Sequence, residues 1–193
     1  MKGRPSTFEN DAIIEKAQQV FWTKGFTASS LDDLLKGMGI GSGSFYNAFK
    51  GGKKELFSKA LSQRRMAFKI FSDQLDKSKA PVELIKDFFR SLALADPHTH
   101  RRGCFIANTV TEMPFIDDDL EQEAIAILKE VEWLYTRNIK RAQENGSLKN
   151  LTDPALLGRY LITVYNGINV TRRMYPDKNQ IAQVIDLQLE IIS

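Results

Sequence analysis

The chain has 193 residues, of which 42% are hydrophobic and 26% are charged, so it can bury a sizeable core and does not have the composition of a disordered protein. Its net charge of +3 is too small to indicate a partner by itself. No apolar run approaches the roughly 18 residues of a membrane span, and Glu9 and Asp11 stand where a signal peptide would need its apolar region. The single cysteine, Cys104, rules out an internal disulfide. We therefore expect a cytoplasmic protein with no membrane segment.

The spacing of apolar residues indicates helices along the whole chain, and no alternation is long enough for a strand. Glycine and proline mark the ends and beginnings of these helices. The sequence therefore predicts an all-α protein with about nine helices, at about residues 10–24, 29–37, 42–49, from 53, from 81, 103–113, 117–145, 154–174 and 178–192. The segment DPHTHRRG, residues 96–103, is expected to be a loop.

The stretch from 26 to 49, FTASSLDDLLKGMGIGSGSFYNAF, predicts two short helices joined by a glycine-bearing turn. Ser29 is the expected N-cap of the first helix, because Asp32 follows three residues later and completes a capping box. Gly37 is its expected end, and Ser42 is the expected cap of the second helix.

The second of these helices carries the pattern that points to function. Phe45 and Phe49 lie one turn apart and are expected to face inward, which leaves Tyr46 and Asn47 facing outward. Its first residues, SGS, are small and polar, so the backbone of this helix can approach a polyanion closely. A helix-turn-helix requires this geometry, because its second helix enters the major groove with its N-terminal residues.

The positive charge is concentrated near this segment. Residues 1–54 hold eight basic and five acidic residues, which accounts for the whole net charge, while residues 55–193 are neutral. Lys2 and Arg4 form a basic arm that is expected either to enter a minor groove or to be disordered. The glycines between 37 and 43 do not match a nucleotide-binding loop, since no strand precedes them and the spacing differs. His98 and His100 lack partner ligands in sequence, so no metal site is expected.

Four motifs in order, WTKGF, TASSLDDLL, GSGSFYNAF and KKELF, resemble the N-terminal domain of the TetR/AcrR family of transcriptional regulators. The match covers about residues 8–62, and residues 63–193 agree only in the number and order of helices. The resemblance implies a three-helix DNA-binding domain of the helix-turn-helix type at 1–58 and a helical effector-binding and dimerisation domain at 59–193.

The resemblance also implies what the protein does. It implies a homodimer that usually acts as a repressor on a near-palindromic double-stranded DNA operator and releases it when a small-molecule effector binds; it implies no cofactor. It further implies that the helices at about 153–174 and 178–192 pair across the dimer. Each helix carries an apolar stripe: Leu157, Leu161, Val164 and Ile168 on the first, and Ile181, Val184, Ile185, Leu189 and Ile192 on the second. Such a stripe by itself is more often core within one chain, and the resemblance favours its interpretation as the pairing surface.

The residues that contact DNA divide into two expected groups. Because most protein–DNA hydrogen bonds go to phosphates, the positioning contacts are assigned to Ser29, Ser30, Ser42 and Tyr46. The residues expected to read base edges are Ser44 and Asn47, with Gly43 through its backbone. The resemblance places a phosphate-binding lysine at Lys53, with Lys54 as the alternative because the KGGK link is one residue longer than the commoner one.

An effector pocket between the later helices is expected from aromatic and amide residues at helical spacing. Its candidate residues are Phe88, Phe105, Asn108, Thr109, Trp133, Tyr165, Asn166 and Asn169. Cys104 stands beside Arg101 and Arg102, so two interpretations stay open: a buried structural cysteine, or a thiol that senses oxidants or electrophiles.

Two other classes of function are weaker. An all-helical enzyme would need a catalytic constellation, which two histidines in one segment and one cysteine do not supply, so no enzymatic activity is expected. A purely structural dimerisation module would leave the small polar face at 42–47 without a purpose.

Overall fold

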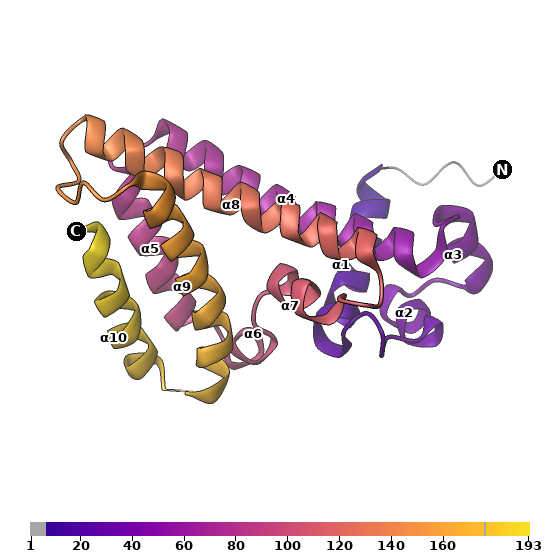
Figure 1. Cartoon of the computed structure of the whole chain (residues 1–193). Helices are drawn as coiled ribbons and strands as arrows, with labels where there is room; N and C mark the ends of the chain where they lie inside the picture. The colour runs from indigo at the N-terminus through magenta and orange to yellow at the C-terminus, as the bar shows by residue number, and fades with distance from the viewer. Residues whose placement is uncertain (1–6, 176) are drawn as a thin grey trace. The chain divides into compact units, whose positions relative to one another are not determined.

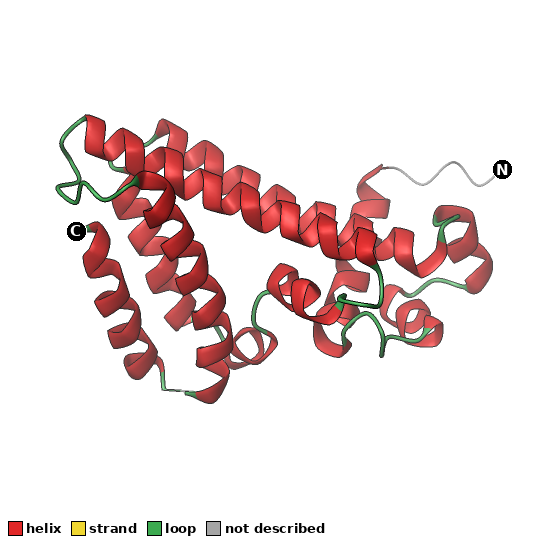
Figure 2. Cartoon of the chain, viewed as in Figure 1, coloured by secondary structure: helices red, strands yellow, loops and turns green. Residues whose placement is uncertain are grey.

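The computed structural model describes residues 7–175 and 177–193, and the basic arm at 1–6 lies outside them. The described residues form ten α-helices and a final 3-10 turn, joined by loops and with no strand among them (Figure 1, Figure 2). The helices are α1 (Thr7–Lys24), α2 (Leu31–Met38), α3 (Ser42–Ala48), α4 (Gly52–Lys77), α5 (Pro81–Leu94), α6 (Pro97–Arg102), α7 (Phe105–Glu112), α8 (Asp118–Glu144), α9 (Pro154–Met174) and α10 (Lys178–Leu189), followed by η1 (Glu190–Ile192). The all-α prediction is confirmed, and no helix in the described part is long and apolar enough to cross a membrane.

Helix α6 accounts for the difference between the nine helices expected and the ten observed. The segment predicted to be a loop is helical because Asp96 caps it, accepting hydrogen bonds from the backbone N–H groups of His98 at 2.9 Å and Thr99 at 3.1 Å. Pro97 occupies the first position of the helix, where its missing N–H costs nothing. The loop prediction was wrong because this helix has no apolar periodicity to reveal it.

The chain divides into two compact units, and helices α4, α7 and α8 each run from one unit into the other. The first unit comprises the chain up to Ala67 together with Asn108–Ile125. The second comprises Phe68–Ala107 together with Ala126–Ser193. The division of function at residue 58 remains a prediction.

In the first unit, the core forms where α1, α2, α3 and the start of α4 bring their apolar faces together. Phe57 of α4 meets Phe21 edge to face at 4.8 Å between ring centroids, and meets Phe26 at 5.0 Å. Burying each such ring stabilises the fold by about 1.5–3 kcal/mol. The amide Nε2 of Gln18 donates to the carbonyl of Ala60 at 2.9 Å, which ties α1 to α4 inside this core.

In the second unit, α10 packs on α5, and α6 packs on α9. Two arginines of α8 hold the end of α4: Arg137 pairs with Asp76 at 2.6 Å, and Arg141 donates to the carbonyl of Leu75 at 2.6 Å. The Arg141 contact supplies a donor to a carbonyl group in the last turn of α4, where partners within the helix are lacking. The two longest helices of the chain, α4 and α8, are thereby joined within this unit.

The apolar stripes of α9 and α10 are part of the core within a single chain. Leu157, Leu161, Val164 and Ile168 are buried, and so are Ile181, Ile185, Leu189 and Ile192, whereas Val184 is 41% exposed. Their interpretation as the surface that pairs between chains was therefore wrong for the eight buried side chains, because these already pack within one chain. The opposite faces of the same two helices expose a second apolar set, Leu156, Val170, Met174, Val184 and Leu187.

Candidate nucleic-acid interface

The turn before α2 places two consecutive serines in different environments. Ser30 is the N-cap: its hydroxyl accepts a hydrogen bond from the backbone N–H of Asp33 at 3.1 Å, and the Asp33 carboxylate accepts one from the Ser30 N–H at 3.2 Å. Ser29 is 1% exposed, and its hydroxyl donates to the carbonyl of Gly25 at 2.5 Å. The predicted cap at Ser29 was wrong by one residue, because Ser29–Asp32 and Ser30–Asp33 both fit the capping-box spacing and only the turn decides between them.

The capping carboxylate is also ion-paired. Lys24, the last residue of α1, lies 2.5 Å from Asp33. This hydrogen bond, with those from Ser30, lowers the pKa of Asp33 to about 2. The end of α1 and the start of α2 are therefore linked by charge as well as by packing.

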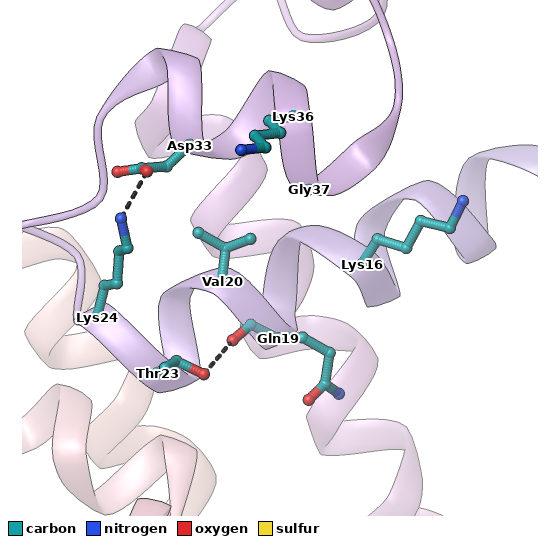
Figure 3. Close-up of a pocket in the computed structure, with 8 residues that line it drawn as sticks. All are labelled: Lys16, Gln19, Val20, Thr23, Lys24, Asp33, Lys36 and Gly37. Atoms are coloured by element: carbon teal, nitrogen blue, oxygen red, sulfur yellow. Dashed lines mark hydrogen bonds and ion pairs between the residues drawn. The ribbon is translucent and has the colours of Figure 1, made fainter.

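A groove between α1 and α2 has a volume of about 490 Å³ and lies within the first unit (Figure 3). Val20 points across it toward Gly37, and a Cβ added to Gly37 would lie 2.5 Å from Val20 Cγ2. The close approach of the two helices thus requires glycine at this position. Gly37 was predicted to end α2, but the helix continues to Met38, and Gly39 ends it in the left-handed region at φ 72°.

Helix α3 is held by its phenylalanines and exposes its other side. Phe45 and Phe49 are 1% and 3% exposed, with their ring centroids 5.5 Å apart. Gly41, and not Ser42, precedes the helix as its N-cap, so that Ser42 is the first helical residue. The cap prediction was again displaced by one residue, because Gly41 takes the extended backbone that begins the helix.

The predicted DNA-reading residues share the exposed side of α3. Ser42, Gly43, Ser44, Tyr46 and Asn47 are all exposed, and a Cβ at Gly43 would meet no atom within 4 Å. Tyr46 is 53% exposed, and its ring lies edge to face on Phe45 with the ring centroids 5.1 Å apart. No charged side chain occurs in this helix. The surface is therefore small, polar and open, and the N-terminal end of the helix dipole favours an anion.

The start of α4 holds two neighbouring lysines in different ways. The ammonium of Lys53 lies 4.5 Å from the centre of the Phe26 ring, and burial lowers its pKa, an effect opposed by the charge of Glu112. Lys54 pairs with Asp119 at 2.6 Å and Asp117 at 3.0 Å, and these hydrogen bonds raise its pKa. The charge of Lys54 is thus neutralised within the chain, whereas Lys53 has no ion pair at this distance among the described residues.

The residues predicted for an effector pocket are only partly brought together. In the second unit, the ring of Phe88 stacks on Tyr165 at 5.9 Å and meets Phe71 at 4.9 Å. The side chain of Asn169 is 3% exposed and donates to the carbonyl of Tyr165 at 2.8 Å. Phe105, also in this unit, is 2% exposed.

The other predicted pocket residues are Trp133, Asn108, Thr109 and Asn166. Trp133 is 59% exposed, and the guanidinium of Arg137 covers its ring at 4.6 Å. Asn108 and Thr109 belong to the first unit. Asn166 is half-buried, and its amide oxygen has no hydrogen-bond partner among the described residues.

Tyr135 is the residue of this region that sequence reasoning missed. Its side chain is fully buried, its ring lies 5.8 Å from Phe89, and its hydroxyl has no hydrogen-bond partner among the described residues. Burial raises the pKa of this hydroxyl, so it stays protonated and can donate to a ligand. The sequence gives no signal for it, because a tyrosine in an amphipathic helix usually has its hydroxyl at the surface.

Cys104 is buried at 4% exposure, and its sulfur accepts a weak hydrogen bond from the N–H of Ala107 at 3.5 Å. Burial agrees with the structural interpretation of this cysteine. Within the described residues no group of three or more His, Cys, Asp or Glu side chains is placed to hold a metal ion.

Comparison with known proteins gives the class that this geometry defines. Residues 13–60 match the family described as "Bacterial regulatory proteins, tetR family", and residues 82–187 match the "Tetracyclin repressor-like, C-terminal domain". Together the two matches cover most of the chain. The chain therefore belongs to the TetR family of helix-turn-helix transcriptional regulators.

Several relatives match over nearly their whole length. The chain is 27% identical to the HTH-type transcriptional regulator YezE of Bacillus subtilis (strain 168), over 98% of this chain and 99% of the relative. It is 25% identical to the HTH-type transcriptional repressor DhaR of Mycobacterium sp. (strain GP1), over 93% and 90%. Among solved structures it is 25% identical, with a TM-score of 0.83, to a cysteine mutant of the TetR-family regulator CifR in complex with a 26-bp operator DNA, over 99% and 100% of the two chains.

Proposed function

We propose that the protein is a homodimeric repressor that binds a near-palindromic DNA operator through α3 and releases it when a small-molecule effector binds. In this proposal residues 1–58 bind DNA, and residues 59–193 bind the effector and form the dimer. The observation that carries it is the exposed, uncharged face of α3, which Phe45 and Phe49 hold against the core of the first unit. An anchored helix with an open polar face can enter the major groove without rearranging.

The individual contacts follow from how each side chain is placed. The phosphate contacts are assigned to Ser42, Tyr46 and Lys53, because these groups sit at the N-terminal ends of α3 and α4 or carry an exposed hydroxyl. Ser29 and Ser30 contribute by fixing the turn, since the Ser29 hydroxyl donates to the carbonyl of Gly25 and the Ser30 hydroxyl donates to the carboxylate of Asp33 at 2.9 Å.

Base reading is assigned to Ser44 and Asn47, whose side chains lie exposed on α3. An asparagine amide can both donate and accept, so it can pair with the N6 and N7 atoms of adenine. Gly43 lets the backbone approach the base edges, because it has no side chain and the space beside it is open. Lys54 is not assigned a phosphate contact, because Asp117 and Asp119 neutralise its charge.

The dimer surface is assigned to the exposed apolar faces of α9 and α10. Leu156, Val170 and Met174 recur at helical spacing on α9 and are 56%, 58% and 66% exposed, while Leu187 on α10 is 64% exposed. Exposed apolar side chains that line up along two adjacent helices favour association with a second copy. A two-fold dimer would set the two α3 helices on half-sites about 34–36 Å apart.

The effector is assigned to the aromatic cluster of Phe88, Phe89, Tyr135 and Tyr165. These rings supply apolar surface, and the Tyr135 hydroxyl supplies a buried donor without an acceptor among the described residues. A small, partly apolar molecule with one hydrogen-bond acceptor fits this combination. The proposed function requires neither a cofactor nor catalysis by this chain, and it places the protein in the cytoplasm, where the bacterial chromosome lies.

The names of two relatives support this proposal. DhaR is named as a repressor, and the matched CifR structure contains operator DNA. The test is selection of bound sequences from a random duplex pool by the full-length protein. We expect a near-palindromic consensus whose half-site centres lie one helical turn apart. Recovery of asymmetric or unrelated sequences would overturn the proposal.

A further inference from the structure

A second pocket in the second unit has a chemistry that the proposed effector site does not explain. It has a volume of about 260 Å³ and lies where the loop after α5, the helix α6, the end of α9 and the start of α10 meet. Its lining residues are Ala95, Pro97, His100, Arg101, Arg172, Arg173 and Lys178. Four of these seven side chains are permanently cationic at neutral pH, and no carboxylate is among them.

One carboxylate, that of Asp96, acts on both His100 and Arg172 through its charge. Its carboxylate is already used to cap α6, accepting from the N–H groups of His98 and Thr99 and from the Thr99 hydroxyl at 2.6 Å. These hydrogen bonds lower the pKa of Asp96 to about 2. This carboxylate is therefore already committed to a helix cap.

Arg172 is the most informative side chain of this pocket. It is 3% exposed, its Nε has no hydrogen-bond partner, and it forms no ion pair with a carboxylate among the described residues. Burial lowers the pKa of its guanidinium, an effect that the charges of Tyr165, Cys104 and Asp96 oppose. A buried charge without a partner is strongly unfavourable, so native structures pair it or leave it for a ligand.

His100 adds a second unpaired group to the same wall. It is 6% exposed, its ring is hydrogen-bonded to the backbone of Ala93, and its Nε2 has no partner among the described residues. The exposed cations Arg101 and Lys178 stand at the rim of the pocket, where they can draw an anion inward. Gly103 keeps the neighbouring backbone close, because a Cβ there would lie 2.5 Å from Arg173 Nη2 and 3.0 Å from the Asn169 carbonyl.

We propose that this pocket, which we call the basic pocket, is a binding site for a small oxyanion, either a carboxylate or a phosphate group, bound by the guanidinium of Arg172 and by His100. The volume is below the roughly 300–1,000 Å³ of pockets for drug-sized molecules, so the ligand is a small organic acid or phosphate ester. The bound anion supplies the counter-charge that Arg172 lacks, and it favours protonation of His100, whose Nε2–H then donates to it. The inference concerns binding alone and does not depend on the proposed DNA function.

The test is titration calorimetry of the full-length protein with two probes, inorganic phosphate and succinate, whose relative affinities distinguish a phosphate-type from a carboxylate-type ligand. Sodium chloride at matched ionic strength and the neutral succinamide are the controls. We expect saturable binding of at least one probe and of neither control. Arg172→Met should weaken that binding at least tenfold, because the methionine keeps the volume and removes the charge.

Arg159→Met is the matched control, since Arg159 lies on the same helix and is exposed. It does not line the basic pocket, and its guanidinium pairs with the carboxylate of Glu132 at a distance of 3.4 Å. It should leave binding unchanged. Lys178→Met, at an exposed position, keeps the test valid if the buried substitution fails to fold, and should weaken binding several-fold. Absence of saturable binding by both probes, or equal binding by the wild type and by the Arg172 or Lys178 variant, overturns the proposal.

Discussion

The carboxylate of Glu112 accepts a hydrogen bond from the backbone N–H of Phe26 at 2.9 Å, and its second oxygen accepts one from Thr27 at 2.8 Å. Glu112 is the last residue of α7, while Phe26 and Thr27 form the turn between α1 and α2. A Cβ at Gly25 would lie 2.9 Å from this carboxylate, so glycine is required for the contact. The end of α7 therefore fixes the turn that places α2 and α3. Because α7 starts at Phe105 in the second unit, a shift of this helix on effector binding would reach the DNA-binding helices through this carboxylate.

Glu112→Gln is expected to destabilise the protein by about 1–3 kcal/mol, because an amide leaves one of the two backbone N–H groups facing another donor. Operator affinity should fall as well, since the turn before α2 is no longer fixed. Thermal unfolding and operator binding measure the two effects. Glu144→Gln is the control, because Glu144 is exposed at the end of α8. This substitution should change neither the stability nor the operator affinity. Equal stability and affinity in the two variants would show that the Glu112 contact is not important.

Gly37→Ala tests the approach of α1 and α2. The added methyl group overlaps Val20, which costs about 1–3 kcal/mol for overpacking, whereas the gain in helix propensity is about 1 kcal/mol. We expect net destabilisation in the wild type. In a Val20→Ala background the overlap is absent, so the same change should be neutral or stabilising by up to about 1 kcal/mol. A double-mutant cycle of urea unfolding measures this change of sign, and a purely additive cycle would contradict the overlap.

Lys53→Ala and Lys54→Ala should separate the two lysines that sequence reasoning left as alternatives. Loss of Lys53 should reduce the slope of log affinity against log salt by about one unit, because one phosphate contact is lost. Loss of Lys54 should leave the slope unchanged, since its charge is already balanced by Asp117 and Asp119. Operator binding over a range of salt concentrations measures both. The reverse result would move the phosphate contact to Lys54.

The stability of the protein should depend on pH through His100. Burial, together with the charge of Arg172, lowers the pKa of His100 below 6.5, so the unfolded chain binds a proton more readily than the folded one. This contribution to stability is present above pH 6.5 and is lost as the pH falls below it. His100→Asn should flatten the decline of the unfolding temperature between about pH 7.5 and pH 5.5, measured without added oxyanions. His98→Asn, at an exposed position of the same helix, should leave the decline as it is.

Much of the fold follows from local signals. The sequence predicts α9 at its observed bounds, because an aspartate cap followed by proline marks its start. Phe45 and Phe49 were expected to face inward at one-turn spacing, and they do. The capping serines were displaced by one residue, since adjacent serines satisfy the same spacing rule and the preceding turn chooses between them. The same cap signal as in α9, Asp96-Pro97, was present before α6, but its polar composition concealed the helix.

The environments of the residues in the two proposed ligand sites could not be predicted from the sequence. The unpaired hydroxyl of Tyr135 and the buried charge of Arg172 arise from which helices surround them, and no spacing rule reports that. His100 was interpreted as a surface residue because its segment was taken for a loop, yet it is 6% exposed. Trp133 was placed in a pocket on its apolar character, but α8 turns it outward toward Arg137.

In the proposed function, α3 reads DNA bases through Asn47 and positions the protein through Tyr46. The most direct measurement is the affinity of three proteins, the wild type, Asn47→Ala and Tyr46→Phe, for the selected operator and all its single-base variants. Asn47→Ala should remove the preference at one base pair of each half-site, by about 1–3 kcal/mol, and keep the preference elsewhere. Tyr46→Phe should weaken binding to every variant alike. A uniform loss of affinity for Asn47→Ala, with every base preference intact, would contradict the account.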